Sequence, residues 1–208
     1  ITTPEYVVDK ATKLETIYDR IHEVRMRFEV IKRDAEIDYW RQVADGGDRE
    51  ALRAALEAQW RTLDEEFAFI ARCNQGGEFM DAAQIARIRH IAERSWRRTL
   101  DDRLGLAHEE RTRKDRVPAQ PLPVVEPLLA DKPEHRFERG LQDQIAPDNP
   151  WGFRLDAPEL LYDRGELHNL CIGRGTLTGE ERYKINEHIV QTIIMLSRLP
   201  FPKPLRRV

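Results

Sequence analysis

The sequence from Leu14 to Ala44 is LETIYDRIHEVRMRFEVIKRDAEIDYWRQVA, and this stretch decides the fold class. Its apolar residues recur at steps of three and four, with charged residues between them, as on an α-helix that has one apolar face. The pattern therefore predicts one long amphipathic helix. Its apolar stripe consists of Leu14, Ile17, Ile21, Val24, Phe28, Ile31 and Ala35.

The residues that follow predict a second long helix antiparallel to the first. Asp45-Gly46-Gly47-Asp48 is typical of a turn, and Asp48 can cap a helix that runs from about Arg49 to Cys73. Asn74-Gln75-Gly76-Gly77 ends that helix, because glycine tolerates the left-handed backbone found after many helices. Two long helices joined by a short turn form an antiparallel hairpin.

The rest of the chain predicts further helices around an irregular segment. A third helix is expected from about Asp81 to Arg98, and a short one between Pro158 and Leu170. Residues 117–158 hold most of the prolines and should be mainly loop. Thr178 and Glu181 fit a capping box that opens a last helix, which runs to about Leu199. The fold class is therefore predicted to be all-α.

Composition excludes several classes of protein. The chain has 208 residues, 34% of them charged, and a formal net charge of −3, which argues against a general nucleic-acid binder. No apolar run approaches the ~20 residues that a membrane-spanning helix needs. Cys73 and Cys171 lack the spacing of metal ligands and suit a reducing cytoplasm, which is the expected location. Composition and spacing alone indicate a soluble helical domain.

One stretch of the sequence resembles a known family. Residues 172–208 begin IGRGTLTGEERYKINEHIV and are similar to the HD-GYP phosphohydrolases, whose members carry a pattern G-x-L-T-x-E-E followed by I-x-x-H. The resemblance implies that His188 is a metal ligand. The residues that fill the pattern are Gly175, Leu177, Thr178, Glu180, Glu181, Ile185 and His188.

A second stretch, TTPEYVVDKATKL from Thr2 to Leu14, resembles the part of the same family that directly follows its His-Asp motif. The resemblance places Lys10 beside the active site as a substrate-binding residue. The resemblance also implies that the chain has four parts. Two of them form a split catalytic region, which residues 1–14 start and residues 172–208 continue. Residues 15–116 are an inserted helical hairpin or bundle, and residues 117–171 are a Pro-rich irregular segment.

The family resemblance implies metal-dependent hydrolysis of a phosphodiester such as cyclic di-GMP by a bacterial signalling protein. The family binds a pair of metal ions such as Fe or Mn. Such a bound pair lowers the pKa of a water molecule and neutralises the charge of the phosphate oxygens. Neither the His-Asp pair nor the His-His-Glu and Gly-Tyr-Pro motifs of the family occur in these 208 residues. We therefore expect a piece of a longer protein that is inactive by itself, because one ligand cannot hold a catalytic metal pair; the divalent metal ions are expected in the full-length parent.

Other interpretations of the same residues stay open. The amphipathic stripes from Leu14 to Ile70 also fit a module for homodimerisation or protein interaction without catalysis. His22 is a rival metal ligand, and Lys10 also fits a solvated lysine at the start of a helix. Three tryptophans are expected to anchor the core rather than to form a ligand cage; they are Trp40, Trp60 and Trp96.

Overall fold

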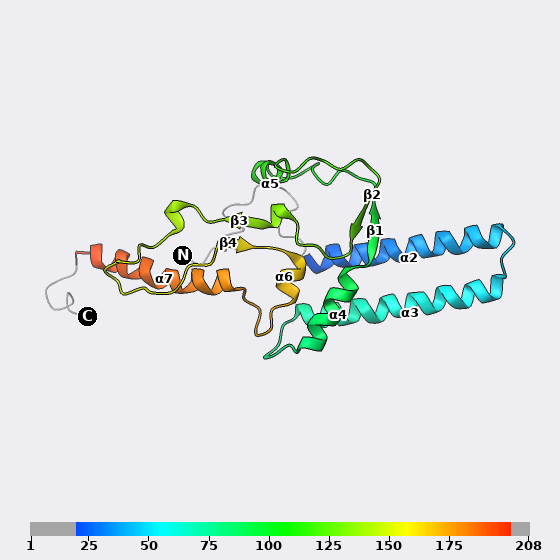
Figure 1. Ribbon diagram of the computed structural model, residues 1–208, viewed down its shortest axis with the longest axis horizontal. Helices are drawn as coiled ribbons and strands as arrows, with labels where there is room; N and C mark the ends of the chain where they lie inside the picture. Colours follow the sequence, from blue (N-terminus) through cyan, green and yellow to red (C-terminus); the bar gives the residue numbers. More distant parts are fainter. Residues whose placement is uncertain (1–19, 201–208) are drawn as a thin grey trace. The chain divides into compact units, whose positions relative to one another are not determined.

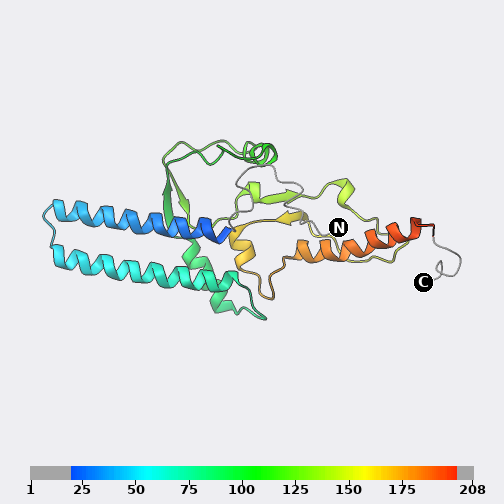
Figure 2. The same ribbon diagram turned by 180° about the vertical axis from the view of Figure 1, so that it is seen from behind.

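The computed structural model describes residues 20–200, so Lys10 lies outside the described residues. These residues divide into two compact units. Unit 1 comprises the chain up to His135 together with Gly165–Thr176, and unit 2 comprises Arg136–Arg164 together with the chain from Leu177 onward. Figures 1 and 2 show the ribbon from opposite sides.

Unit 1 is built on the predicted hairpin. Helix α2 (Arg20–Ala44) and helix α3 (Arg49–Asn74) lie side by side and antiparallel in both views (Figures 1 and 2). The Asp48 side chain accepts hydrogen bonds from the amides of Glu50 and Ala51, as expected for the cap of α3. The hairpin prediction is confirmed over the described residues.

The turn after α3 requires glycine. Gly76 has a φ of 70°, in the left-handed region, and its backbone approaches the Thr176 side chain closely. The neighbour of this turn is the segment that follows helix α6 (Glu166–Leu170). The amide of Gly175 in that segment donates a hydrogen bond to the carbonyl of Gly77 at 3.0 Å. This bridge joins the end of α3 to a segment about 100 residues later in the chain.

The third helix is shorter than predicted. Helix α4 (Ala82–Ala92) begins with a capping box formed by Asp81 and Gln84. It ends six residues before the predicted Arg98, and Ser95–Arg98 form strand β1, which pairs antiparallel with strand β2 (Val124–Pro127). The prediction placed Trp96 on a helix, and this was wrong because pairing with β2 prevails over the local helical pattern.

The core of unit 1 lies in the half of the hairpin farther from its turn. There α4 and the segment after β2 pack against α2 and α3. The most deeply buried side chains include Leu63 and Ile70 of α3, Ile88 and Ile91 of α4, and Leu128. Trp40 is half exposed and does not anchor this core, contrary to expectation. Helix α5 (His108–Lys114) and the 3-10 turn η1 (Pro133–His135) complete the unit.

Unit 2 combines a two-stranded sheet with one long helix. Strand β3 (Arg136–Glu138) pairs antiparallel with strand β4 (Leu160–Asp163), and the turn η2 (Leu141–Asp143) lies between them in sequence. Helix α7 (Gly179–Arg198) contacts β4. On α7, Tyr183 packs edge-to-face against Phe153, and the Arg139 guanidinium lies 4.7 Å from the Tyr183 ring centroid.

The described residues confirm a mainly α-helical fold, to which two short two-stranded sheets are added. The expected short helix between Pro158 and Leu170 is reduced to α6, with β4 before it. The chain passes between the two units three times, after His135, Arg164 and Thr176. These units follow packing contacts and do not test the predicted boundaries of catalytic and inserted parts. Among residues 20–200, no helix has the length and apolar character to span a bilayer.

Candidate functional site

Helix α7 carries the residue expected to bind metal, and its start is fixed by a capping box. The buried Thr178 hydroxyl accepts a hydrogen bond from the Glu181 amide at 3.2 Å. The Glu181 carboxylate accepts one from the Thr178 amide at 2.9 Å. Two backbone amides at the helix start, those of Thr178 and Glu181, are thereby satisfied, and the predicted capping box is confirmed.

The two faces of α7 differ in burial. Tyr183, Glu187 and Val190 are buried within the described residues. Turned away from them are two exposed isoleucines, Ile185 at 53% exposure and Ile189 at 59%. The two isoleucines leave apolar surface exposed on this face of α7.

His188 lies on the exposed side of α7. Its backbone carbonyl accepts a hydrogen bond from the Thr192 hydroxyl at 2.9 Å, and its imidazole is open to solvent. Glu181 lies two turns earlier on about the same side, but its carboxylate is engaged in the cap. Among residues 20–200, no group of three or more His, Cys, Asp or Glu side chains could hold a metal ion. The described residues alone therefore do not fit a metal centre.

Glu187 is a buried acid that the sequence analysis did not single out. Its carboxylate pairs with the Lys184 ammonium at 2.8 Å, one helical turn earlier. The hydrogen bond and the charge of Glu187 raise the pKa of Lys184 above its ordinary value. The i, i+3 spacing of opposite charges was the available signal, and it indicates an ion pair that stabilises the helix.

A second buried acid, Glu166 at the start of α6, holds three parts of unit 1 together. Its carboxylate accepts hydrogen bonds from the Arg27 guanidinium of α2 at 2.7 Å and from the Ala130 amide at 3.2 Å. The Arg20 guanidinium lies 3.9 Å away. Burial by itself would raise the pKa of Glu166, but these hydrogen bonds and charges together hold it below its ordinary value.

His135 lies beside the same cluster. Its Nδ1 accepts a hydrogen bond from the Lys132 amide at 3.2 Å, and an Arg20 nitrogen lies 3.5 Å from its Nε2. Burial, followed by the charge of Arg20, lowers the pKa of His135. His22, the rival ligand, is half-buried in the first turns of α2, and no ligand group that contains it occurs in the described part of the chain.

A third charged cluster joins β1 and β2 to the turn η1. The Lys132 ammonium lies within 4 Å of the carboxylates of Glu126 and Asp102, and Lys114 likewise approaches Asp102 and Glu134. With the Arg98–Glu126 pair at 3.0 Å, three acids face three bases. The charges balance within the cluster, which indicates a structural role for it.

Comparison with known proteins supports an HD-type relationship for one part of the chain. The family model described as the HD domain matches residues 123–208, a segment that includes β3, β4 and α7. This match supports an HD-domain family, whose members are generally metal-dependent phosphohydrolases. The comparisons with curated proteins and with solved structures gave no match.

Proposed function

We propose that this chain is part of a bacterial metal-dependent phosphohydrolase of the HD-GYP type, which hydrolyses a phosphodiester such as cyclic di-GMP. The observation that carries the proposal is the HD-domain match over residues 123–208. The sequence pattern from Gly175 to His188 supports the finer assignment, because it follows the HD-GYP resemblance residue by residue.

His188 would supply one metal ligand, and Lys10 would contact the substrate phosphate. Imidazole is a common ligand for Fe and Mn, and such ions activate water and neutralise phosphate charge when bound. The open apolar face around His188, with Ile185 and Ile189, is available for a segment that carries the other ligands. One ligand does not hold a catalytic metal pair, so these 208 residues alone are expected to be inactive.

The test uses the polypeptide with its natural flanking sequence. We expect His-Asp before the chain and His-His-Glu after it in the reading frame. The protein loaded with Mn²⁺ should hydrolyse bis(p-nitrophenyl) phosphate, and His188→Ala should lose both bound Mn²⁺ and hydrolysis. His90→Ala is the matched control, because His90 is 82% exposed on α4. If His188→Ala retains the metal, the assignment of His188 is wrong. If the flanking motifs are missing, the enzyme proposal fails.

A second candidate function is a helical module for homodimerisation or protein interaction without catalysis. Ile37 and Trp40, at 46% and 50% exposure, leave an apolar surface on the outer side of α2. Large exposed side chains of this kind often mark interaction sites. Sedimentation tests the homodimer directly: a monomer at high concentration would rule it out, and a dimer that Trp40→Ala dissociates would support it.

A further inference from the structure

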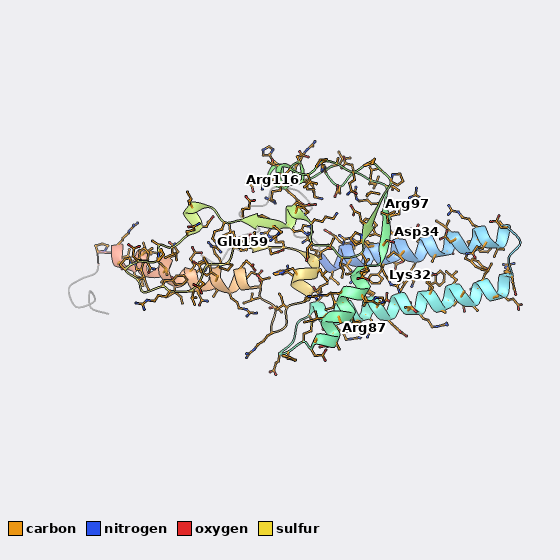
Figure 3. All side chains as sticks on the ribbon, viewed as in Figure 1. Lys32, Asp34, Arg87, Arg97, Arg116 and Glu159 are labelled. Carbon is orange, nitrogen blue, oxygen red and sulfur yellow. The ribbon has the colours of Figure 1, made fainter. Side chains whose placement is uncertain are left out.

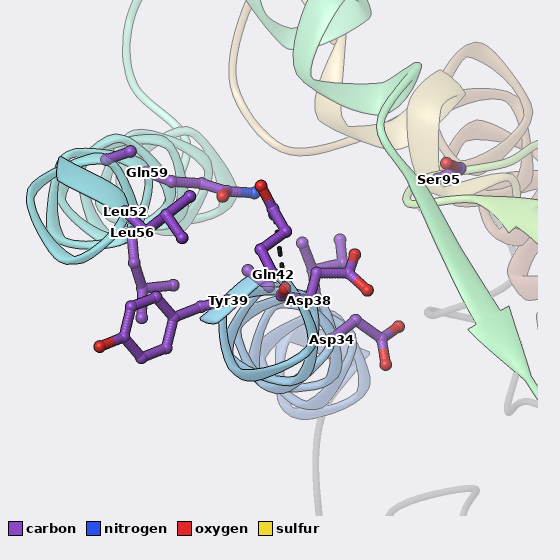
Figure 4. A pocket seen from close by; sticks show the side chains of 11 residues that line it. Asp34, Asp38, Tyr39, Gln42, Leu52, Leu56, Gln59 and Ser95 are labelled. Atoms are coloured by element: carbon purple, nitrogen blue, oxygen red, sulfur yellow. Dashed lines mark hydrogen bonds between the residues drawn. The ribbon is translucent and has the colours of Figure 1, made fainter. Parts of the chain in front are cut away.

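A groove runs between α2 and α3 along the half of the hairpin next to the turn. Two adjoining hollows, of about 340 Å³ and 440 Å³, share Gln42 and Leu52. Together they extend from Ile31 of α2 to the turn at Asp45. Ser95 of β1 also lines the first hollow, which Figure 4 shows from close by. At about 1.5 Å per residue, the α2 side measures roughly 22 Å, or about four helical turns.

Leucines and alanines line the groove together with Gln42 and Gln59, and one of its walls is low. Leu52 and Leu56 line it from α3, and Ala35 lines it from α2. Ala51 and Ala55 form the wall on the α3 side, where a methyl group is the whole side chain. Small side chains let a further helix approach to the 8–10 Å distance that helix packing requires, roughly one helix diameter.

The rim of the groove is acidic. Asp34, Asp38, Asp45 and Asp48 line the two hollows, and no lysine or arginine of residues 20–200 does so. Asp38 pairs with Arg41 at 3.1 Å, with both side chains exposed. Asp34, labelled in Figure 3, has no ion-pair partner in the described part of the chain. The charge of Asp34 is thus not balanced by an ion pair in the described part of the chain, and an acidic rim favours a cationic ligand.

In the half of the hairpin farther from the turn, a third helix covers α2 and α3, whereas the half that contains the groove has no such cover among the described residues. There α4 covers α2 and α3, and its Ile88 and Ile91 are 0% and 1% exposed in the common core. Between residues 32 and 62, by contrast, Tyr39 and Leu56 are the buried residues. Two helices with so little shared core form a marginal pair, and a third helix would complete the bundle.

We infer that this groove binds an amphipathic helix of a partner protein, one with lysine or arginine on both sides of its apolar stripe. The apolar stripe would cover Leu52 and the alanines beside it, and the basic residues would face Asp34 and Asp38. A second copy of the chain is disfavoured here, because two acidic rims would repel each other. The inference goes beyond the proposed hydrolase, since the groove involves neither His188 nor a metal.

The test is fluorescence anisotropy of labelled synthetic helices with the 208-residue chain. The basic probe has leucine at the a and d positions of about three heptads and lysine at e and g. The control probe has glutamate at e and g. We expect the basic helix to bind and the acidic helix to fail, and we expect salt to weaken the binding.

Two pairs of variants locate the binding. Asp34→Lys with Asp38→Lys should weaken binding at least about tenfold, because attraction becomes repulsion. Glu29→Lys with Glu65→Lys is the matched reversal on exposed positions outside the groove, and it should change binding by less than about threefold.

Ala55→Trp should block the groove, whereas Ala68→Trp, at an exposed site elsewhere on α3, should leave binding intact. Circular dichroism checks that all variants keep the helical content.

Three results would overturn the inference. The first is equal binding of the basic and acidic helices. The second is equal loss of binding in the two charge-reversal variants. The third is self-association through the groove, seen in sedimentation as a dimer that Ala55→Trp dissociates while the basic helix fails to bind.

Discussion

Replacing Glu166 by alanine should destabilise unit 1 strongly, because the change leaves a cation without its partner. The side chain of Glu166 is 5% exposed and that of Arg27 is 17% exposed. Removing one member of a buried ion pair costs about 3–5 kcal/mol. Arg27 keeps its hydrogen bond to the Leu128 carbonyl and some contact with water, so we expect the lower end, about 3 kcal/mol.

Glu23→Ala is the matched control, since Glu23 pairs with the same Arg27 at 3.4 Å but is 61% exposed. Its loss should cost about 0.5 kcal/mol or less. Urea unfolding, followed by far-ultraviolet circular dichroism, measures both. With a slope of about 2 kcal/mol per molar urea, Glu166→Ala should lower the midpoint by about 1.5 M.

The pH dependence gives an independent check. The pKa of Glu166 is lower in the folded chain than in the unfolded one, so its stabilising effect is present above the unfolded pKa of 4.5 and is lost as pH falls through the folded pKa. The difference in the free energy of unfolding between the wild type and Glu166→Ala should therefore shrink as the pH is lowered. Equal costs for Glu166→Ala and Glu23→Ala at neutral pH would refute the reasoning.

Three further predictions concern single positions. Gly76→Ala should cost about 1 kcal/mol or more in urea unfolding because of its positive φ and its close neighbour, whereas Gly77→Ala, which has open space, should cost less. The lowered pKa of His135 means that stability falls as pH drops below the unfolded value of 6.5, and His135→Asn should flatten the stability–pH profile there. Thr178→Ala should cost about 1 kcal/mol by loss of the cap, and calorimetry of the two proteins tests this. A melting temperature unchanged in Thr178→Ala would contradict the role of the cap.

The sequence predicted the parts of the fold that depend on residues close together in the chain. The hairpin follows from apolar periodicity, and the starts of α3 and α7 follow from Asp48 and Thr178, whose hydrogen bonds reach only two or three residues along the chain. Strand β1 was missed because its partner, Val124–Pro127, lies almost thirty residues away, where periodicity carries no information about it.

In the candidate site and the charged clusters, too, local contacts could be predicted from the sequence and long-range contacts could not. Glu166 contacts Arg27 across 139 positions of sequence, and no pattern of spacing could have joined them. His188 was identified by family resemblance and not by its surroundings, since it is exposed and belongs to no group of three or more potential ligands among the described residues. It stays a prediction until the flanking sequence is tested.

The three passages of the chain between units 1 and 2 have a practical consequence for dissecting this protein. Neither unit corresponds to one continuous stretch, so a single truncation cannot isolate either one: cutting after His135 also separates Gly165–Thr176 from the rest of unit 1. A protease that nicks a single passage would leave both halves joined by the other two. Separate expression of either unit would thus require a redesigned linker in place of the excised segment.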